Sequence, residues 1–530
     1  MRAISLARHR LATWSAGLLL GLLPLAGGCA TDQSGDGPLR DEGLMAPAPT
    51  GLAQELDGIL ASPVLEGALA SVVVRHAETG ETLYSHRGNE RLAPASNAKL
   101  LTAAAALEVL GTEHRFETSV WSDGKRLGPV LQGNLYLKGT GDPSMLAQDY
   151  DALAAKLAES GLTLVQGELW ADDTWFDSVR LGSGWEWEDE PYYYAAQVSA
   201  LTVSPDGDFD AGNIIADVTP GTAAGQAPRI AFLPNTDYVK VDNRAVTTEA
   251  GSPNTLSVER QHGTNTFLVT GTMPLDAGTD RSYNSVAEPT GYAAAIFRAA
   301  LETHGIRVLA SATRFGATPV SATRLAGRSS PPLSELLPLF LKLSNNGHAE
   351  ILTKAMGKAV HGEGSWDAGI QVISDFLSAN GVNANTLQIS DGSGLSRHNL
   401  ISAEHLAALL LAVRGKPWFS NFYEALPIAG APQRLVGGTL RSRMKNTAAA
   451  GNVHAKTGSL DAVSSLSGYV ANAAGEPLVF SILFNHFVQN GVSRLEDAIA
   501  VALANSGTKR DTARFRQPVG GRVIEALRKP

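Results

Sequence analysis

The chain changes character twice along its length, and this change limits the folds open to it more than any other feature. Before about residue 115, a strand, a turn and a returning strand precede an Ala-rich helical stretch that starts at Ser96. Short β-branched runs and Gly/Asp turns fill residues 115–325, where only residues 291–303 favour a helix. Helical periodicity returns at Leu333 and gives way to strand-like runs and one last helix. This order predicts an α/β (α+β) core that is interrupted by a large β-rich insertion.

Domain limits follow from the same changes in pattern. A chain of 530 residues suggests three or four domains of about 150 residues each. We predict a discontinuous core domain (51–115 and 326–508), an inserted domain II (116–200 and 285–325), an inserted domain III (201–284) and a basic tail (509–530).

The N-terminal segment has the order of a secretory signal. Three Arg residues precede an apolar run over residues 11–25, which is too short to span a bilayer comfortably as a permanent helix. Small residues then lead to Cys29, as in the lipobox of bacterial lipoproteins, so we expect residues 1–28 to be removed and Cys29 to be lipidated. The alternative is a conventional cleavage that leaves a free thiol. Residues 29–50 are polar with Gly and Pro and are predicted to be a tether, so the expected location is the periplasm, with a lipid anchor in a membrane.

Charge and cysteine content exclude several classes of protein. The chain has 43 basic and 52 acidic residues and a formal net charge of -9, so it lacks the positive field that nucleic-acid binding requires. No nucleic-acid partner is expected. Cys29 is the single cysteine, which excludes an intramolecular disulfide, an Fe–S cluster held by four Cys and structural zinc of the multi-Cys type.

The first motif that suggests chemistry is S-x-x-K at Ser96–Lys99. Residues three apart share one face of a helix, so the Lys99 amine can reach the Ser96 hydroxyl and act as its base. The motif alone is weak, since a serine in this position is more often a helix cap. Other matches start at Ser122, Ser442 and Ser506, but only Ser96 opens a clear helix. We therefore predict Ser96 as the nucleophile.

The second motif is S-x-N at Ser344–Asn346, which lies on a connection between two predicted helices. The Ser344 hydroxyl can relay a proton between Lys99 and a leaving amine, and the Asn346 amide can bond a substrate carbonyl and Lys99. An ordinary helix cap is the alternative, because S-x-N also occurs elsewhere in the chain.

The third motif is K-T-G at residues 456–458, and it occurs once. Residues 454–460 are predicted to form a strand that pairs with an extended peptide, with Lys456 and Thr457 holding a terminal carboxylate. Gly458 permits close backbone approach, and the N–H of Ser459 would bind a developing oxyanion together with that of Ser96. An isolated K-T-G is more often a turn.

Together and in this order, the three motifs resemble those of the active-site serine penicillin-recognising enzymes. The long separation of Ser96 from Ser344 resembles the D-alanyl-D-alanine carboxypeptidases/endopeptidases of the penicillin-binding protein 4 type, the class C low-molecular-mass penicillin-binding proteins. Further similar segments are GTGDP (139–143), DDTWF (172–176), GWEWED (184–189), VSAL (198–201) and DGSGLSR (391–397). One departure is Asn345, where Asp is often found. The middle residue points away from the chemistry in the family pattern, so we expect little effect.

The resemblance implies a penicillin-binding, β-lactamase-like serine transpeptidase core. It implies hydrolysis of the terminal D-Ala of peptidoglycan stem peptides, or of the crosslink between D-Ala and diaminopimelate, with neither a metal nor a cofactor. In this reading Ser96 attacks, Lys99 takes its proton, and Ser344 and Lys456 assist proton transfer to the leaving group. Penicillin would acylate the same serine, and the resulting acyl-enzyme would hydrolyse slowly.

Two further residues are hypotheses for the substrate groove. Arg397 ends the Gly-rich segment, and Asp173 lies near the aromatic Phe176, so both could read the stem peptide. A surface Arg and a solvated Asp are the alternatives. For the whole protein, the competing functions are a β-lactamase or esterase of the same superfamily, and a catalytically silent wall-binding lipoprotein.

Overall fold

Both ends of the folded chain contribute to one antiparallel sheet, whose strand order is β2-β1-β24-β23-β22. In this computed structural model, residues 51–507 are described. The strands are β1 (Leu69–His76), β2 (Thr82–His86), β22 (His454–Leu460), β23 (Val463–Ala471) and β24 (Pro477–Asn485). Because β1 pairs with β24 from Leu69↔Asn485 to His76↔Leu478, the N-terminal hairpin is joined directly to the last strand. The strands of the predicted discontinuous core therefore meet in one sheet.

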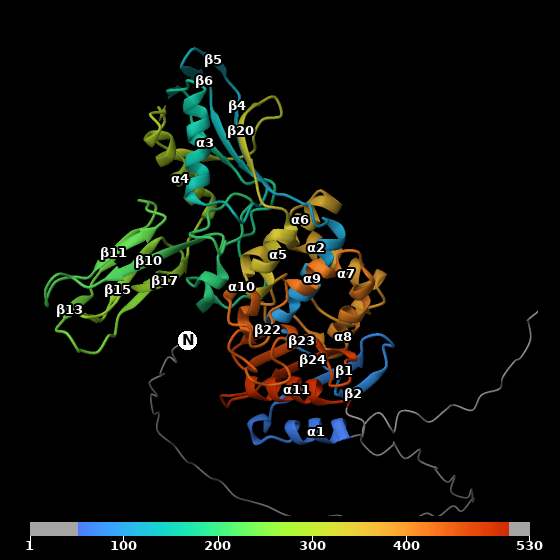
Figure 1. The fold of residues 1–530 in the computed structure, drawn as a ribbon. Helices are drawn as coiled ribbons and strands as arrows, with labels where there is room; N and C mark the ends of the chain where they lie inside the picture. The colour runs from blue at the N-terminus through green and yellow to red at the C-terminus, as the bar shows by residue number, and fades with distance from the viewer. Residues whose placement is uncertain (1–50, 508–530) are drawn as a thin grey trace, which may run out of the picture. The chain divides into compact units, whose positions relative to one another are not determined.

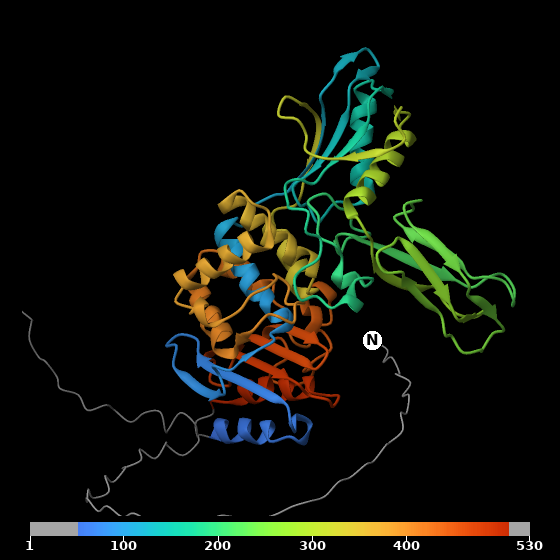
Figure 2. The ribbon, with the colours of Figure 1, turned by 180° about the vertical axis from the view of Figure 1, so that it is seen from behind.

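Helices cover both faces of this sheet. Successive strand residues point to opposite faces. Val72 and Val74 pack in a cluster with α1 (Gly51–Leu60) and α11 (Ser493–Asn505), whereas Val73 packs in the cluster of the remaining core helices. Figure 1 shows α1 and α11 together on one side of the sheet, and Figure 2 shows the same layers from behind. Because both faces are covered, β23 and β24 are buried along nearly their whole length, and the buried serines of β23 form hydrogen bonds instead of facing solvent.

The helices on the other face supply most of the core. They are α2 (Lys99–Val109), α5 (Leu333–Lys342), α6 (Asn346–His361), α7 (Trp366–Ala379), α8 (Ala403–Ala412), α9 (Phe419–Glu424) and α10 (Arg434–Gly437). The predicted helices near 333–343, 349–360, 366–379 and 403–413 are confirmed. α2 is buried from Lys99 to Leu107 without a polar face, and its run of Ala lets neighbouring helices approach closely.

The helix predicted to open at Ser96 begins in a different way. Ala95–Ala98 form a short 3-10 helix, and α2 begins only at Lys99. No side-chain hydrogen bond caps either element at its N-terminus, so the Ser96 hydroxyl is not used as a cap. Ala95 has a φ of 46°, a left-handed conformation that is costly for a residue with a side chain. The serine therefore sits on a sharp turn in front of the helix.

The insertion starts with two sheets, ordered β19-β9-β7-β4-β20 and β18-β8-β6-β5. Their strands are β4 (Glu117–Ser122), β5 (Lys125–Leu127), β6 (Val130–Gln132), β7 (Leu135–Gly139), β8 (Leu164–Val165), β9 (Leu169–Asp172), β18 (Arg307–Val308), β19 (Thr313–Phe315) and β20 (Thr323–Ser329). The predicted boundary at residue 325 falls inside β20, which pairs with β4 along its length. The insertion's sheet therefore continues to Ser329, and the other domain limits stay a prediction.

Two helices, not one, accompany these sheets: α3 (Ala147–Glu159) and α4 (Pro289–Thr303). The expectation of a single helix in this region is therefore wrong. α3 buries Tyr150, Leu153 and Leu157 on one face and leaves the rest of its surface polar, so it forms through packing against α4 and the sheet.

Residues 213–285 form the remaining small sheets, ordered β11-β10-β17, β12-β15-β14 and β13-β16. Their strands are β10 (Asn213–Thr219), β11 (Arg229–Leu233), β12 (Lys240–Asn243), β13 (Val246–Thr248), β14 (Ser257–Arg260), β15 (Thr266–Thr270), β16 (Thr272–Pro274) and β17 (Asp280–Ser285). A last pair joins β3 (Arg91–Leu92) to β21 (Ile401–Ser402) in the core.

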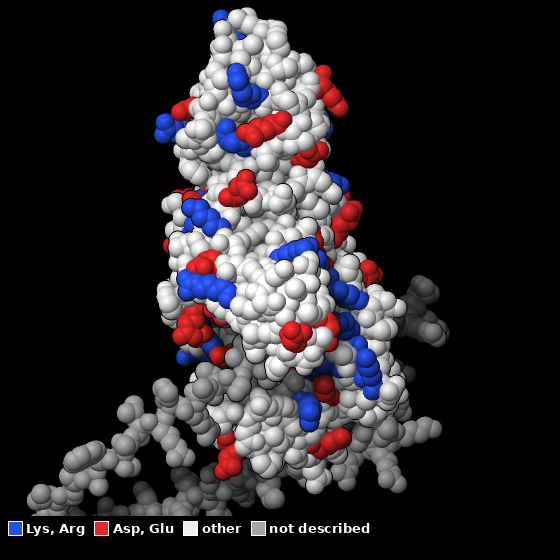
Figure 3. All heavy atoms as spheres, turned by 90° about the vertical axis from the view of Figure 1, so that its left-hand side faces the viewer, with Lys and Arg blue, Asp and Glu red and all other residues white. Residues whose placement is uncertain are grey.

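Several sequence predictions concern residues that are not described here. The signal at residues 1–28, Cys29, the tether at 29–50 and the tail at 509–530 all lie outside the described residues. Within residues 51–507, no helix has the length and apolar character needed to span a membrane, and no group of three or more His, Cys, Asp or Glu side chains could hold a metal ion. On the face in Figure 3, basic and acidic side chains are interspersed.

Candidate active site

The fold brings the three sequence motifs together beside β22, the edge strand of the core sheet. Ser96 lies on the 3-10 helix Ala95–Ala98, which packs against β22 and β23. Ser344 lies in the turn between α5 and α6 with a φ of 62°, and Asn346 is the first residue of α6. Lys456 is on β22 itself. Side chains from three segments that are far apart in the sequence thus converge on one place.

Lys99 is the hub of the site. Its Nζ donates to Ser96 Oγ at 2.9 Å, to Asn346 Oδ1 at 2.6 Å and to the Ser393 carbonyl at 2.8 Å. The side chain is fully buried, and burial lowers its pKa to about 7, although the negative charges of Glu350 and Asp391 oppose the shift. A lysine with a pKa near neutrality can give up its proton and accept the one on Ser96.

A second lysine, Lys456, contacts the serine of the second motif. Lys456 Nζ donates to Ser344 Oγ and to the Thr457 carbonyl, both at 2.8 Å. Burial, together with the positive charge of Lys99, lowers the Lys456 pKa well below its usual value. The two ammonium groups therefore disfavour each other's charge, which makes each a better proton carrier.

The K-T-G strand fits closely against the turn that carries the nucleophile. A Cβ added at Gly458 would lie 2.9 Å from the Ser96 nitrogen and 2.2 Å from Ser465 Oγ, so only glycine fits there. The backbone of Ser96 therefore contacts β22 at Gly458, which directly precedes Ser459. The Thr457 hydroxyl donates to the Thr439 hydroxyl at 2.8 Å, and this second threonine was not anticipated from the sequence.

The middle residue of the S-x-N motif has a supporting role. Asn345 accepts the His348 N–H as the cap of α6 and donates to Asp210 Oδ1 at 2.7 Å and to the Phe209 carbonyl at 3.2 Å. Asn346 donates to the Tyr194 carbonyl at 2.7 Å. The insertion therefore touches the S-x-N motif through both asparagines.

Behind Lys99 lies a buried carboxylate that sequence reasoning missed. Glu350 on α6 accepts the backbone N–H groups of Gly392 and Ser393 at 2.9 and 2.8 Å, and the Trp366 indole N–H at 2.7 Å. These bonds hold the segment whose Ser393 carbonyl meets Lys99. Burial raises the pKa of Glu350 to about 7. Nothing in the sequence marks Glu350, because it is one of several charged and polar residues along α6.

The Gly-rich segment 391–397, noticed in the sequence, is a tight loop around the nearby Asp391. This carboxylate accepts the N–H groups of Gly394 and Ser396 at 2.8 and 2.6 Å, and the Trp185 indole N–H at 2.9 Å. Gly394 has a φ of 84°, and a Cβ there would lie 1.8 Å from the Ala95 carbonyl. The glycine is needed because the loop packs directly on the 3-10 helix that presents Ser96.

Arg397, predicted for the groove, lies beyond the end of β22. Its guanidinium donates to the Asp461 carbonyl at 2.7 Å and forms an ion pair with Glu186 at 3.2 Å. Nearby, Asp189 accepts the Tyr194 hydroxyl at 2.8 Å. Burial raises the pKa of Asp189, and Arg397 opposes that shift. Asp189 ends the GWEWED segment at residues 184–189, but no pattern in the sequence marks it as a site residue.

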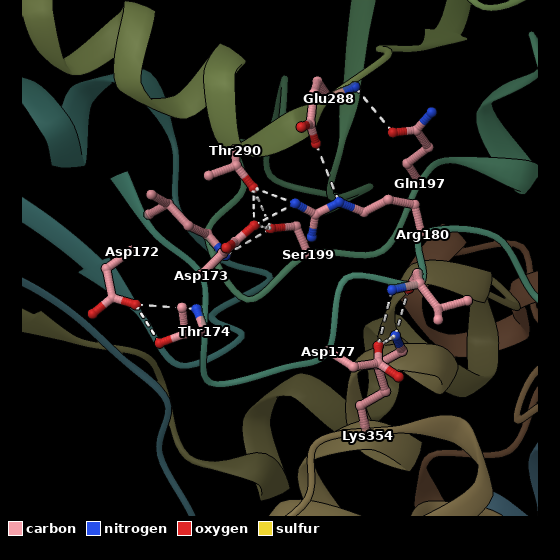
Figure 4. A network of polar contacts seen from close by, with 12 residues as sticks. Asp172, Asp173, Thr174, Asp177, Arg180, Gln197, Ser199, Glu288, Thr290 and Lys354 are labelled. Carbon is pink, nitrogen blue, oxygen red and sulfur yellow. Dashed lines mark hydrogen bonds and ion pairs between the residues drawn. The ribbon is translucent and has the colours of Figure 1, made fainter. Parts of the chain in front are cut away.

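Asp173, the other residue predicted for the groove, is part of a network within the insertion (Figure 4). Its Oδ2 forms a short ion pair with Arg180 and accepts the Thr290 hydroxyl at 2.5 Å and the Ser199 hydroxyl at 3.4 Å. Arg180 also donates to Glu288 at 3.1 Å. Among the described residues, none of these partners belongs to the three motifs, so the structure does not bring Asp173 to them.

The same view shows how α6 is tied to the insertion. Lys354 Nζ donates to Asp177 Oδ1 at 2.5 Å and to the Val179 carbonyl at 2.7 Å (Figure 4). It also lies 3.8 Å from the centre of the Trp366 ring, whose indole N–H bonds Glu350. Contacts therefore run from the insertion through Lys354 and Trp366 to the carboxylate behind Lys99.

Comparisons with known proteins agree with this geometry. The model of the D-Ala-D-Ala carboxypeptidase 3 (S13) family matches residues 52–506. The chain is 46% identical over 480 residues to a D-alanyl-D-alanine carboxypeptidase of Actinomadura sp. (strain R39), covering 90% of this chain and 87% of the relative. It is 27% identical over 426 residues to the D-alanyl-D-alanine carboxypeptidase DacB of Haemophilus influenzae, covering 80% and 86%.

Solved structures lead to the same family. The crystal structure of penicillin-binding protein 4 from Haemophilus influenzae superposes with a TM-score of 0.73 at 26% identity, covering 85% of this chain and 98% of that one. Its complex with a β-lactam gives a TM-score of 0.68 at 25% identity, covering 85% and 98%. The predicted fold class and family resemblance are confirmed. From the match over residues 52–506 and the convergence of its three motifs, the chain belongs to the D-Ala-D-Ala carboxypeptidase 3 (S13) family.

Proposed function

We propose that this protein is a serine-type D-Ala-D-Ala carboxypeptidase/endopeptidase, which hydrolyses peptidoglycan stem peptides or crosslinks through an acyl-enzyme on Ser96. The observation that carries the proposal is the position of Lys99 Nζ, which lies 2.9 Å from Ser96 Oγ while fully buried. A weak nucleophile is thereby paired with a base whose pKa is about 7. Membership of the family supplies the substrate class.

The hydrogen bonds of Lys99 and Lys456 suggest the order of proton transfers during acylation. Neutral Lys99 takes the proton of Ser96 as Oγ attacks the carbonyl carbon of the penultimate D-Ala. The backbone N–H groups of Ser96 and Ser459 stabilise the oxyanion. The proton then reaches the leaving amine through Ser344, which Lys456 holds at 2.8 Å. The peptide C–N bond breaks, and terminal D-Ala, or the amine side of a crosslink, leaves.

Deacylation reverses these roles. Neutral Lys99 takes a proton from a water molecule as its oxygen attacks the Ser96 ester carbon, and it then gives this proton to Oγ as the ester C–O bond breaks and the shortened peptide departs with a new carboxyl group. A β-lactam enters the same cycle because its strained amide takes the place of the peptide bond. Its ring-opened leaving group stays covalently attached, which explains a long-lived acyl-enzyme.

The substrate would lie along β22 as an added strand. Thr457 and Gly458 line the place where a terminal carboxylate meets the buried Lys456. Arg397, at the far end of β22, would meet a polar group of the stem peptide. Asp173 remains a hypothesis for a more distant part of the substrate.

The place of action is proposed from the sequence alone. The order of residues 1–28 supports export to the periplasm, and Cys29 after small residues supports a lipid anchor. Replacing Cys29 with Ser should release the protein into the soluble fraction. Unchanged membrane partitioning would contradict the anchor.

Labelling with a fluorescent penicillin, followed by mass spectrometry of the modified peptide, tests the central proposal. We expect one adduct on Ser96, and Ser96→Ala should abolish it. Ser442→Ala is the matched control, since this exposed serine also begins an S-x-x-K sequence and should label normally. An adduct elsewhere would overturn the proposal, and rapid loss of the adduct would favour a β-lactamase.

A further inference from the structure

A pocket lies within the insertion, between the segment 187–194 and the small sheets. Its volume is about 440 Å³. The residues that line it are Glu188, Pro191, Tyr192, Val258, Glu259, Arg260, Gln261, His262, Leu268 and Asn284. It shares no residue with the three motifs. The steps above leave it without a role.

His262 and Tyr192 line this pocket with aromatic rings, and Trp187, which is not itself a lining residue, stacks on His262. The indole of Trp187 is 73% exposed and stacks on the imidazole of His262, with ring centroids 3.9 Å apart and planes within 6°. Tyr192 is 45% exposed and stacks on Tyr194 at 5.6 Å and 5°. Exposing an indole to water is unfavourable, and the stacking holds its ring in a fixed orientation. Such rings present flat apolar faces to a ligand.

The floor of the pocket is rigid and electrically balanced. Arg260 is fully buried and donates to Glu190 Oε1 at 2.6 Å, to the Thr264 carbonyl at 2.6 Å and to the Ser285 hydroxyl at 3.0 Å. Its Nε has no hydrogen-bond partner among the described residues. Because Glu190 neutralises Arg260, the floor offers hydrogen bonds without a free positive charge.

The walls carry amides and carboxylates. Gln261 and Asn284 supply both donors and acceptors, while Glu188 and Glu259 supply acceptors. Glu259 accepts the Ser257 hydroxyl, and within residues 51–507 neither Glu188 nor Glu259 forms an ion pair, so their negative charge disfavours a phosphate or another anion. Aromatic faces combined with neutral and acidic hydrogen-bonding groups suit a neutral ligand that has apolar C–H faces and polar edges, and a pyranose sugar is such a ligand.

The pocket is also placed for a sugar that is attached to the peptide substrate. Tyr192 is two residues from Tyr194, whose carbonyl accepts the Asn346 amide at 2.7 Å. A stem peptide in the active site is joined at its other end to the glycan strand of peptidoglycan. The pocket lies to one side of the reacting centre, on the segment that Tyr194 joins to Asn346, and this is where we infer that the strand would lie.

We propose that Trp187, His262 and Tyr192 form a platform that binds the N-acetylated hexosamine units of the peptidoglycan glycan strand. The inference rests on the proposed function for its choice of sugar. The platform would raise the affinity for stem peptides that are still attached to glycan, relative to free peptides.

Two substrates test the platform: a stem pentapeptide linked to its disaccharide, and the same pentapeptide without sugar. Trp187→Ala should lower kcat/KM for the glycan-linked substrate about tenfold and leave kcat/KM for the free peptide unchanged. Phe315→Ala is the matched control, since this aromatic side chain is 52% exposed on β19 and outside the pocket. Acylation by penicillin reports that each variant is folded. An equal effect on both substrates, or no effect, would overturn the proposal.

Direct binding separates the platform from the chemistry. A β-1,4-linked N-acetylglucosamine tetramer should bind to the Ser96→Ala protein, and both Trp187→Ala and His262→Ala should weaken binding at least tenfold. Absence of tetramer binding, or unchanged binding by both variants, would refute the platform. Failure of the proposed function would appear separately, as absent penicillin labelling of the unsubstituted protein.

Discussion

Two regions of the molecule bury lysine side chains, and the two regions differ in the partners that they give to the buried ammonium groups. In the active site, Lys99 and Lys456 meet hydroxyl, amide and carbonyl oxygens, and among the described residues neither forms an ion pair. At the junction with the insertion, Lys354 contacts the carboxylate of Asp177. Burial lowers the pKa of all three, but only for Lys354 does a directly bonded carboxylate oppose the shift.

The hydrogen-bond partners of a buried lysine decide whether its ammonium group keeps its proton. A buried ammonium with only neutral acceptors loses its proton easily, which suits proton transfer. A buried ammonium that is bonded to a carboxylate keeps its proton and depends on its partner for stability. The comparison therefore predicts opposite phenotypes for the same substitution at Lys99 and at Lys354.

The largest effect is expected from Lys99→Met. Without a base for Ser96, the rate of acylation by penicillin should fall about 10³-fold. The free energy of unfolding should not decrease, because an apolar side chain replaces a buried amine. Stopped-flow labelling and urea denaturation measure the two quantities. Near-normal acylation would show that Lys99 is not the base.

Lys354→Met should have the reverse effect. The free energy of unfolding should fall by about 3 kcal/mol, because the carboxylate of Asp177 loses its buried partner. Acylation by the folded protein should stay within about threefold of normal. The double variant Lys354→Met/Asp177→Asn should regain part of the stability. If acylation fell as far as in Lys99→Met, the contrast between the two lysines would not hold.

Glu350→Gln sharpens the comparison through pH. Acylation needs neutral Lys99, so its rate should rise with pH through about 7. The negative charge of Glu350 raises the Lys99 pKa. Without this charge, the rise of the acylation rate should therefore occur at a lower pH, by about one unit. The matched control is Glu496→Gln, because Glu496 is another fully buried Glu, which lies on α11 and pairs with Arg443. If Glu350→Gln lowered the acylation rate but left the pH at which the rate rises unchanged, the role of Glu350 would be to hold the backbone of residues 392 and 393 and not to set the Lys99 pKa.

The smallest effect is expected at the junction itself, from Asn345→Ala. Loss of the α6 cap should lower the free energy of unfolding by about 1 kcal/mol. Because Asn345 contacts Asp210 rather than Lys99, acylation should fall less than tenfold. Asn346→Ala, which removes a direct partner of Lys99, is the comparison. Equal losses for both variants would show that the bond from Asn345 to the insertion is essential for the chemistry.

Much of the core could be predicted because its signals are local. Period and composition located the core helices and the strand 454–460, and spacing alone placed Lys99 on the same face as Ser96. α3 was missed because its apolar face is narrow and its helical state depends on contact with α4. The predicted limit at residue 325 stays a prediction, and sequence pattern could not show that β20 continues to Ser329, because strand pairing is a long-range property.

The sequence by itself determined the family and the order of the three motifs, and it predicted the pair of Ser96 and Lys99, because each motif consists of residues that are close along the chain. Only the tertiary structure decided which charges surround the base. Glu350, Asp391 and Tyr194 reach the site through contacts between distant segments, whereas Asp173 lies beside Arg180 instead. Burial and charge pairing set the proton affinity of each lysine, and both arise only when the chain is folded.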